Sequence, residues 1–209
     1  MASTKQRGFS LLEMMIAISI SLILAGITYM GLRAVLYQSH TNTAFETTMM
    51  ALRNTRNLSI TQSHEYYVNF NPGGFPAGTI QIQYQPPVVG AGAAPPLQQV
   101  ITYSIPPDVS YAVQAGFPAA SPDGFGAGAV ALDFESTPGV VLNPATVVFM
   151  PDGSARDNQG NLLSSGIVYM TQLSESVYSS RAITVWGATG RIRGWSLNAV
   201  AGAPTWMQQ

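Results

Sequence analysis

The sequence predicts an α+β protein in which one long N-terminal helix, transmembrane in its first half, packs against an antiparallel, β-sandwich-like head. Residues 9–32 form an apolar run with a single charged residue, long enough to cross about 30 Å of hydrocarbon as a helix. Residues 33–63 contain no proline and keep a helix-compatible pattern. All 14 prolines lie from Pro72 onward, where short alternating segments replace the helical period and predict strands.

The apolar run is preceded by two cationic residues, Lys5 and Arg7. Cations before a hydrophobic segment keep the N-terminus in the cytoplasm and send the following chain across the membrane. From Phe9 onward, seven arginines stand against ten acidic residues, which gives a formal side-chain charge of -3. The whole chain has a net charge of -1 and no cysteine, so it has no general attraction to nucleic acid or anionic lipid and no thiol chemistry.

The apolar run does not resemble a cleaved secretory signal. Such a signal carries a small-residue cleavage site after its hydrophobic core, and residues 25–26 give no clean Ala-x-Ala pattern. The helical pattern instead continues through residues 33–63, where Phe45, Met49 and Leu52 stand at positions i, i+4 and i+7. We expect this amphipathic stripe to seat the head on its own helix.

One carboxylate, Glu13, lies just inside the start of the apolar run. A carboxylate within a membrane segment is costly unless it is neutralised, and it marks a functional site by default. The alternative is an acid that reaches the headgroups and has no further role. Which of the two applies depends on the residues around Glu13.

Those residues resemble the N-terminus of type IV pilins and type II secretion pseudopilins. The resemblance rests on a short basic leader that ends in Gly8, followed by FSLLEMMIAISI with Glu13 fifth after the glycine. It implies that a prepilin peptidase removes residues 1–8 at the cytoplasmic face and that the new amine of Phe9 is N-methylated. Many major pilins have a proline near the middle of this helix, where this chain has Met30, and this departure favours a minor component.

Cleavage before Phe9 would supply the partner that Glu13 lacks. In a bundle of such helices, the new amine of one subunit can lie against Glu13 of its neighbour. At 4 Å the attraction is about 4 kcal/mol for an effective dielectric near 20, and the net gain is smaller because both groups lose solvation. The pair also penalises wrong axial registers, since these leave a carboxylate buried without a partner.

Residues 64–209 are expected to form an antiparallel β head, two small sheets packed on the exported half of the helix. Strands are predicted within 64–75, 78–86, 100–105, 130–136, 145–153, 165–173 and 181–197, the last holding two short strands around GATG. Residues 85–99 and 114–129 are predicted as exposed Gly/Pro-rich loops. Residues 49–70, 147–160 and 181–194 resemble the recurring stretches of GspH/FimT-type minor pilins and pseudopilins, which implies a structural role in a tip or initiation complex.

Catalytic residues are not predicted. His40 and His64, the only histidines, are interpreted as solvated residues on or just beyond the helix, and no nucleophile motif is present. Asp133 and Glu135 stand two apart in a predicted strand and share one face. An outward-facing pair is the commoner interpretation of that spacing, and acid–base catalysis is the alternative.

A metal site is not predicted either, and no cofactor is implied. The segment PDGSARDN offers Asp152, Asp157 and Asn158 as oxygen ligands, and some related major pseudopilins bind calcium. The spacing does not match an EF-hand loop. A Pro-Asp-Gly turn explains the aspartate on backbone grounds alone.

DNA contact is the alternative function. In GRIRGW, Arg191 and Arg193 stand two apart on a predicted strand with Trp195 next along it, so that one face presents two guanidiniums and an aromatic ring. This stretch resembles the G-R-x-R of some FimT-type pilins that is linked to DNA uptake. Two arginines support only weak, salt-sensitive binding, and a solvated edge strand is the competing interpretation.

The sequence therefore predicts a non-enzymatic minor pilin or pseudopilin. Expected partners are other pilin or pseudopilin subunits, the prepilin peptidase and the inner-membrane assembly platform. The precursor is expected to cross the inner membrane once, with its head in the periplasm, before it enters a pilus or pseudopilus.

Overall fold

The computed structural model describes residues 10–71, 78–86, 95–126, 130–134, 145–158 and 161–209. The chain divides into two compact units, Met1–Gln38 and Ser39–Gln209. A single helix, α1 (Leu11–Gln62), contributes to both units. It begins after Ser10, whose carbonyl accepts the N–H of Glu13 at 3.0 Å. It ends where Ser63 takes a left-handed conformation, with a φ of 55°, which is a common way for a helix to stop.

In the first unit, α1 presents apolar side chains on all sides. The segment Leu11–Tyr29 is long and apolar enough to cross a membrane, and none of it is buried within the protein. The hydroxyls of Ser19, Ser21 and Thr28 donate to the carbonyls four residues earlier, at 2.8, 2.8 and 2.9 Å. The serine and threonine hydroxyls of this stretch are therefore satisfied by the helix itself.

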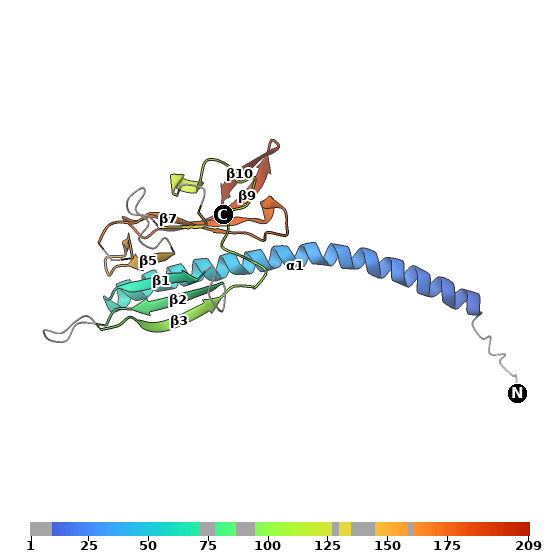
Figure 1. Cartoon of the computed structure of the whole chain (residues 1–209), viewed down its shortest axis with the longest axis horizontal. Helices are drawn as coiled ribbons and strands as arrows, with labels where there is room; N and C mark the ends of the chain where they lie inside the picture. The colour runs from blue at the N-terminus through green and yellow to red at the C-terminus, as the bar shows by residue number, and fades with distance from the viewer. Residues whose placement is uncertain (1–9, 72–77, 87–94, 127–129, 135–144, 159–160) are drawn as a thin grey trace, which may run out of the picture. The chain divides into compact units, whose positions relative to one another are not determined.

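Two five-stranded antiparallel sheets make up the head (Figure 1). The first sheet has the order β3-β2-β1-β5-β6. Its strands are β1 (Tyr66–Asn71), β2 (Thr79–Tyr84), β3 (Gln98–Ser104), β5 (Thr146–Phe149) and β6 (Ala155–Arg156). The second has the order β10-β9-β8-β7-β4. Its strands are β4 (Leu132–Asp133), β7 (Gly166–Met170), β8 (Arg181–Val185), β9 (Ile192–Val200) and β10 (Ala203–Gln208).

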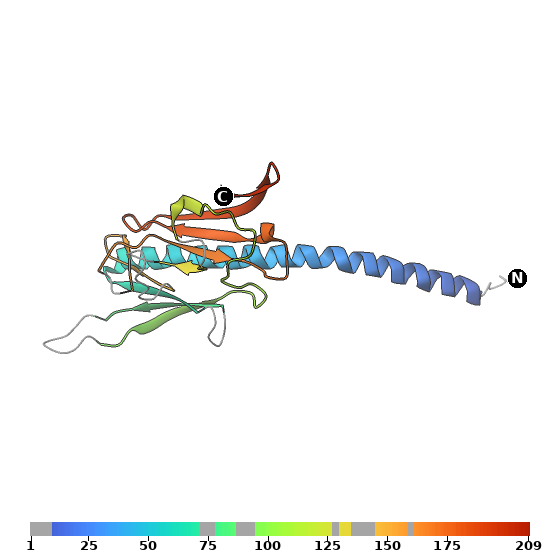
Figure 2. The same ribbon diagram turned by 45° about the horizontal axis from the view of Figure 1, so that its top comes forward.

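One hydrophobic core joins both sheets to residues 44–52 of α1, and Figure 2 shows this part of the helix lying between the two sheets. The predicted stripe is confirmed, since Phe45, Met49 and Leu52 are all buried in this core. Gly194 of β9 faces the helix, and a Cβ there would stand 2.4 Å from both Met49 Cε and Phe45 Cζ. The missing side chain thus lets β9 approach α1 closely enough for the stripe to fill the gap.

The second sheet carries a smaller cluster on its other face. Ile167 and Tyr169 alternate with core residues along β7 and pack there with Trp195 and Trp206. Phe117 and Phe125, from the segment between β3 and β4, cover the cluster. The interpretation of residues 114–129 as an exposed loop is therefore wrong for the described part, 114–126, because its aromatic side chains are packed on the sheet.

The C-terminal strands also differ from the expectation. β9 continues to Val200, and β10 pairs antiparallel with it, from Ala203 opposite Val200 to Gln208 opposite Trp195. β9 is consequently flanked on both sides, by β8 and β10. The interpretation of the arginine-bearing strand as an edge strand is wrong, because the last residues of the chain turn back and cover that edge.

Candidate functional site

Arg193, the second arginine of the predicted DNA surface, is held within the head. Its Nη1 lies 2.7 Å from Oδ1 of Asp123, in an ion pair whose side chains are 21% and 7% exposed. The Asp123 carboxylate also accepts the hydroxyl of Thr184 at 2.7 Å and the indole N–H of Trp186 at 3.3 Å. Asp123 is thus the centre of a bonded group that includes Arg193 and holds residues 122–124 on the sheet.

Trp195 shares this face of β9 with Arg193, as strand alternation predicts, and it too is engaged. Its indole N–H donates to the Thr184 hydroxyl at 3.0 Å, and its ring is half-buried in the aromatic cluster. Arg191 differs because it lies in the turn before β9 and is exposed. Its guanidinium makes no hydrogen bond or ion pair with any described residue. Of the three predicted residues, Arg191 alone presents a free cationic group.

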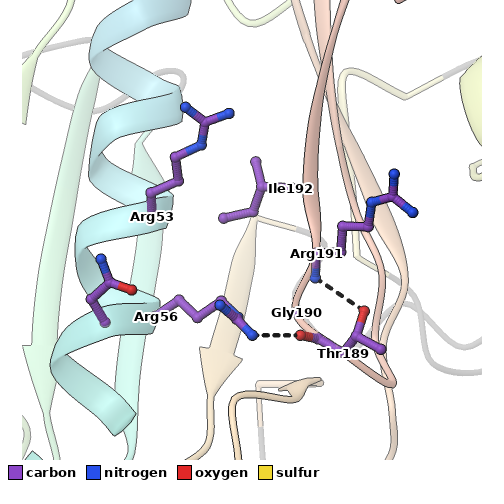
Figure 3. A pocket seen from close by; sticks show the side chains of 7 residues that line it. Arg53, Arg56, Thr189, Gly190, Arg191 and Ile192 are labelled. Atoms are coloured by element: carbon purple, nitrogen blue, oxygen red, sulfur yellow. Dashed lines mark hydrogen bonds between the residues drawn. The ribbon is translucent and has the colours of Figure 1, made fainter. Parts of the chain in front are cut away.

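A pocket of about 500 Å³ lies between α1 and the turn that joins β8 to β9 (Figure 3). Its lining consists of Arg53, Arg56, Asn57, Thr189, Gly190, Arg191 and Ile192. In Figure 3, Arg53 and Arg56 extend from α1 toward the turn, while the Arg191 side chain is directed away from the helix. Three arginines therefore meet around one cavity, with no carboxylate among its described lining residues.

Arg56 is fixed in position by two backbone carbonyls. Its Nε donates to Gly153 O at 3.2 Å and its Nη2 donates to Thr189 O at 3.0 Å, so one side chain joins the β5–β6 turn to the β8–β9 turn. Gly190 makes this arrangement possible, because a Cβ there would stand 2.2 Å from Gly153 O. Arg53, one helical turn earlier, is exposed and has no partner among the described residues.

His40 and Asp108 form a pair that is not evident in the sequence, since 68 residues separate them. His40 Nδ1 lies 2.7 Å from Asp108 Oδ2, and Gln172 Nε2 donates to the same oxygen at 2.7 Å. His40 lies on α1 with its side chain 44% exposed, and it has in addition this tertiary partner. His64 follows the end of α1, half-buried, with its ring centroid 6.3 Å from that of Tyr84.

The carboxylates considered for catalysis and calcium do not converge. Asp133 is only 4% exposed, which corrects its expected outward position, and Glu135 lies outside the described residues. Asp152 accepts the N–H and the hydroxyl of Ser154 at 2.8 and 2.6 Å, and these bonds, with Arg156 nearby, lower the pKa of Asp152. Asp157 accepts the N–H of Asn161 at 2.9 Å. In the described parts of the chain, no three acidic or histidine side chains form a group that could hold a metal.

Glu13 lies on the exposed surface of the apolar part of α1. Within the described part of the chain its carboxylate has no hydrogen-bond or ion-pair partner. Gly8 and Phe9, the predicted processing residues, lie outside the described residues. The first unit thus presents a long apolar helix with one unneutralised acid near its start.

Comparison with known proteins identifies this segment. Residues 3–29 match the family described as the prokaryotic N-terminal methylation motif. This is the N-terminus of the type IV pilins and pseudopilins. No curated protein and no solved structure matches the chain.

The matched motif lies on the apolar helix, and the rest of the described chain forms the β head. A hydrophobic N-terminal helix that bears this motif is consistent with a membrane-anchored prepilin, and proteins with this motif generally have a prepilin peptidase and other pilin subunits as partners. The matched motif is one that structural, pilin-type proteins carry at the N-terminus. The fold agrees, since a long apolar helix packed against antiparallel sheets is pilin-like.

Proposed function

We propose that this protein is a minor pilin or pseudopilin of the GspH/FimT type, a subunit of a type IV pilus or a type II secretion pseudopilus that acts in a tip or initiation complex. The observation that carries the proposal is the methylation motif on a helix whose apolar first part contains one acid, Glu13, with no partner among the described residues. An unneutralised carboxylate on an apolar surface is costly. A second subunit relieves that cost if it brings a cation to the same depth.

In this proposal the cation is the amine of Phe9, released when residues 1–8 are removed. Residues 9–32 hold the precursor in the inner membrane, with residues 33–209 on the periplasmic side, and later form the filament core. The assembly platform extracts the helix from the bilayer, and the amine of one subunit meets Glu13 of the next. The absence of a proline before Pro72 supports a minor component, as does a head with two sheets and long connecting segments.

The test is replacement of Glu13 by Ala in the full-length protein. Membrane insertion and leader cleavage should persist, because the apolar run and the glycine before Phe9 are intact. Incorporation into filaments, measured by shearing and immunoblotting, should fall strongly, because the neighbour's amine then lacks an acid. Glu13→Asp keeps the charge and should retain part of the incorporation.

A matched control is Met14→Ala, a change of the adjacent side chain that leaves the carboxylate in place. It should reduce incorporation little. If Glu13→Ala entered filaments as well as the unmodified protein, the pairing proposal would be abandoned, and the acid would be a headgroup contact of the precursor alone.

DNA contact through Arg191, Arg193 and Trp195 is a second candidate function. The exposed, unpartnered guanidinium of Arg191 supports it. The ion pair of Arg193 with Asp123 weighs against it, because that guanidinium would have to leave a buried carboxylate to reach a phosphate. Retention of the detergent-solubilised protein on double-stranded DNA at low salt, lost in Arg191→Gln, is the expected result. No retention of the unmodified protein would remove this candidate.

A further inference from the structure

The pocket between α1 and the β8–β9 turn has the features of an anion site. Three of its seven lining residues are arginines, and none of the described lining residues is acidic. Like charges around one cavity repel one another, and an anion between them removes the repulsion. The planar guanidinium group matches the oxygens of phosphate better than any other side chain does.

The two helix arginines differ in a way that suits binding. Arg56 is immobilised by its bonds to Gly153 O and Thr189 O, and its Nη1 makes no bond to a described residue. A donor already held in place loses little entropy when a ligand arrives. Arg53 is exposed and unpartnered among the described residues, so its whole guanidinium can close on the ligand. Asn57, one turn beyond Arg53 on the same helix, adds an amide to the lining.

The neighbouring surface gives room for the group that carries the anion. A second pocket of about 550 Å³ shares Arg53 and Asn57 with the first, and its other lining residues are Glu46, Met49, Met50, Asn54 and Tyr103. Cavities of this size accommodate small organic ligands, not only single ions. Apolar and aromatic side chains beside a cationic site favour a ligand with a flat organic part attached to the anion.

We propose that Arg53 and Arg56 bind the phosphate group of an organic phosphate ester, with the attached group directed along α1 toward Met50 and Tyr103. The phosphate can come from a free nucleotide-like ester or from the phosphodiester chain of a nucleic acid. The pocket shares Arg191 with the predicted Arg191–Arg193–Trp195 surface, but here the phosphate is assigned to Arg53 and Arg56 of α1, and the assignment does not depend on how the subunit assembles. The chemistry that recognises the ligand is the same for both sources.

The experiment uses the full-length protein in non-ionic detergent at low salt, titrated in a calorimeter with adenosine monophosphate, adenosine, inorganic phosphate and a single-stranded oligodeoxyadenylate. Adenosine monophosphate should bind, and adenosine should not. Arg53→Gln should weaken this binding at least about tenfold, since it removes a charge-assisted contact. Arg156→Gln is the matched control, because it removes the same charge from a residue that lines neither pocket, and it should weaken binding less than about threefold.

Each outcome decides the proposal. Binding of the monophosphate that Arg53→Gln weakens supports a free ester as the ligand. Binding of the oligonucleotide alone, again weakened by Arg53→Gln, supports the phosphodiester source. The site is refuted if no phosphate ligand binds, if Arg53→Gln binds like the unmodified protein, or if adenosine binds as well as its monophosphate. Unchanged thermal unfolding of Arg53→Gln shows that the comparison is between folded proteins, as an exposed residue predicts.

Discussion

Asp123 determines what Arg193 can do. This aspartate, the middle residue of the short 3-10 turn 122–124, has a φ of 55°, and its nearly buried carboxylate accepts bonds from the guanidinium of Arg193 and from Thr184 and Trp186. A charge at that position is tolerated because each carboxylate oxygen has at least one donor. These bonds to Asp123 attach the segment before β4 to the second sheet. Arg193 therefore has a structural role in the head.

The first prediction concerns this ion pair. Asp123→Asn keeps the size of the side chain, and asparagine also tolerates a positive φ. The substitution removes the negative charge, so the partly buried guanidinium of Arg193 is left beside a neutral group. The free energy of unfolding should fall by about 1–3 kcal/mol, measured by urea denaturation. The control is Asp152→Asn, whose carboxylate is 61% exposed and lies 3.9 Å from Arg156. That change should cost less than about 1 kcal/mol, and equal losses for both variants would contradict the assigned role of Asp123.

The second prediction concerns stability at alkaline pH. Burial raises the pKa of Tyr169 to about 12, and burial also raises the pKa of Tyr111 above its usual range. Between pH 10 and 12 these phenols ionise in the unfolded chain first, so the unfolded state binds fewer protons and stability falls as pH rises. Each tyrosine contributes a slope of about 1.4 kcal/mol per pH unit in that window.

Tyr169→Phe should therefore make the urea midpoint less dependent on pH between pH 10 and 12. The substitution also removes a hydroxyl group from the folded protein at neutral pH. The comparison is of slopes, not of absolute stabilities. Tyr178→Phe, a change of an exposed ring, should leave the slope unaltered. A slope that Tyr169→Phe does not change would show that the Tyr169 phenol ionises with equal ease in both states.

At the scale of elements, the end of α1 holds two turns together. Ser59 donates to Met150 O at 3.1 Å, and Arg56 reaches Gly153 O and Thr189 O from the same helical face. The β5–β6 turn belongs to the first sheet and the β8–β9 turn to the second. The last turns of α1 therefore join the two sheets at one end of the head.

The third prediction tests this junction through Gly190, where φ is +58° and a Cβ would stand 2.2 Å from Gly153 O. Gly190→Ala should lower the free energy of unfolding by about 1–3 kcal/mol more than Gly202→Ala does. Both variants place alanine in a left-handed conformation, but only at residue 190 does the new methyl group also clash with a neighbouring turn. Gly202 shares the positive φ, at +83°, but nothing lies within 4 Å of its Cβ position. The thermal midpoints of the two variants provide the measurement, and similar midpoints would mean that the two turns can move apart freely.

The sequence predicts a helix, strand or turn well where the local pattern of side chains alone determines it. The end of α1, the alternation in β1 and β2, and the turn before β9 all follow from local residue types. β10 was missed because APTWMQ has weak alternation, and its pairing with β9 depends on a turn at Ala201 and Gly202. The packing of Phe117 and Phe125 was missed because Gly and Pro around them indicate a loop, while their burial depends on a distant sheet.

The candidate sites divide in the same way. Glu13 stands out in the sequence because a single acid in an apolar run needs no tertiary information to be noticed. Arg53 and Arg56 do not stand out, because arginines on a helix are ordinary surface residues. Only the contact of Arg56 with Thr189, 133 positions away, forms the pocket. The Arg193–Asp123 pair likewise spans 70 positions.

For the whole molecule, the fourth prediction concerns processing. The protein purified from membranes of cells that contain a prepilin peptidase should have the mass of residues 9–209 plus one methyl group, because the motif at residues 3–29 directs both reactions. Intact-mass spectrometry and N-terminal sequencing provide the measurement. Gly8→Val should retain residues 1–8. A mature protein that still begins with Met1 would leave Glu13 without its proposed cationic partner.

The hydroxyls of Ser19, Ser21 and Thr28 are each bonded to their own helix. When such helices pack side by side, these hydroxyls form no hydrogen bonds between helices. One helix that slides along another therefore breaks only van der Waals contacts, which are weak and have no preferred direction. In the proposed filament we therefore expect subunits under tension to slide past one another in small steps, with Glu13 of each subunit as the polar contact that resists. The elasticity of the proposed filament would thus follow from hydroxyl groups that bond within their own helix and not to a neighbour.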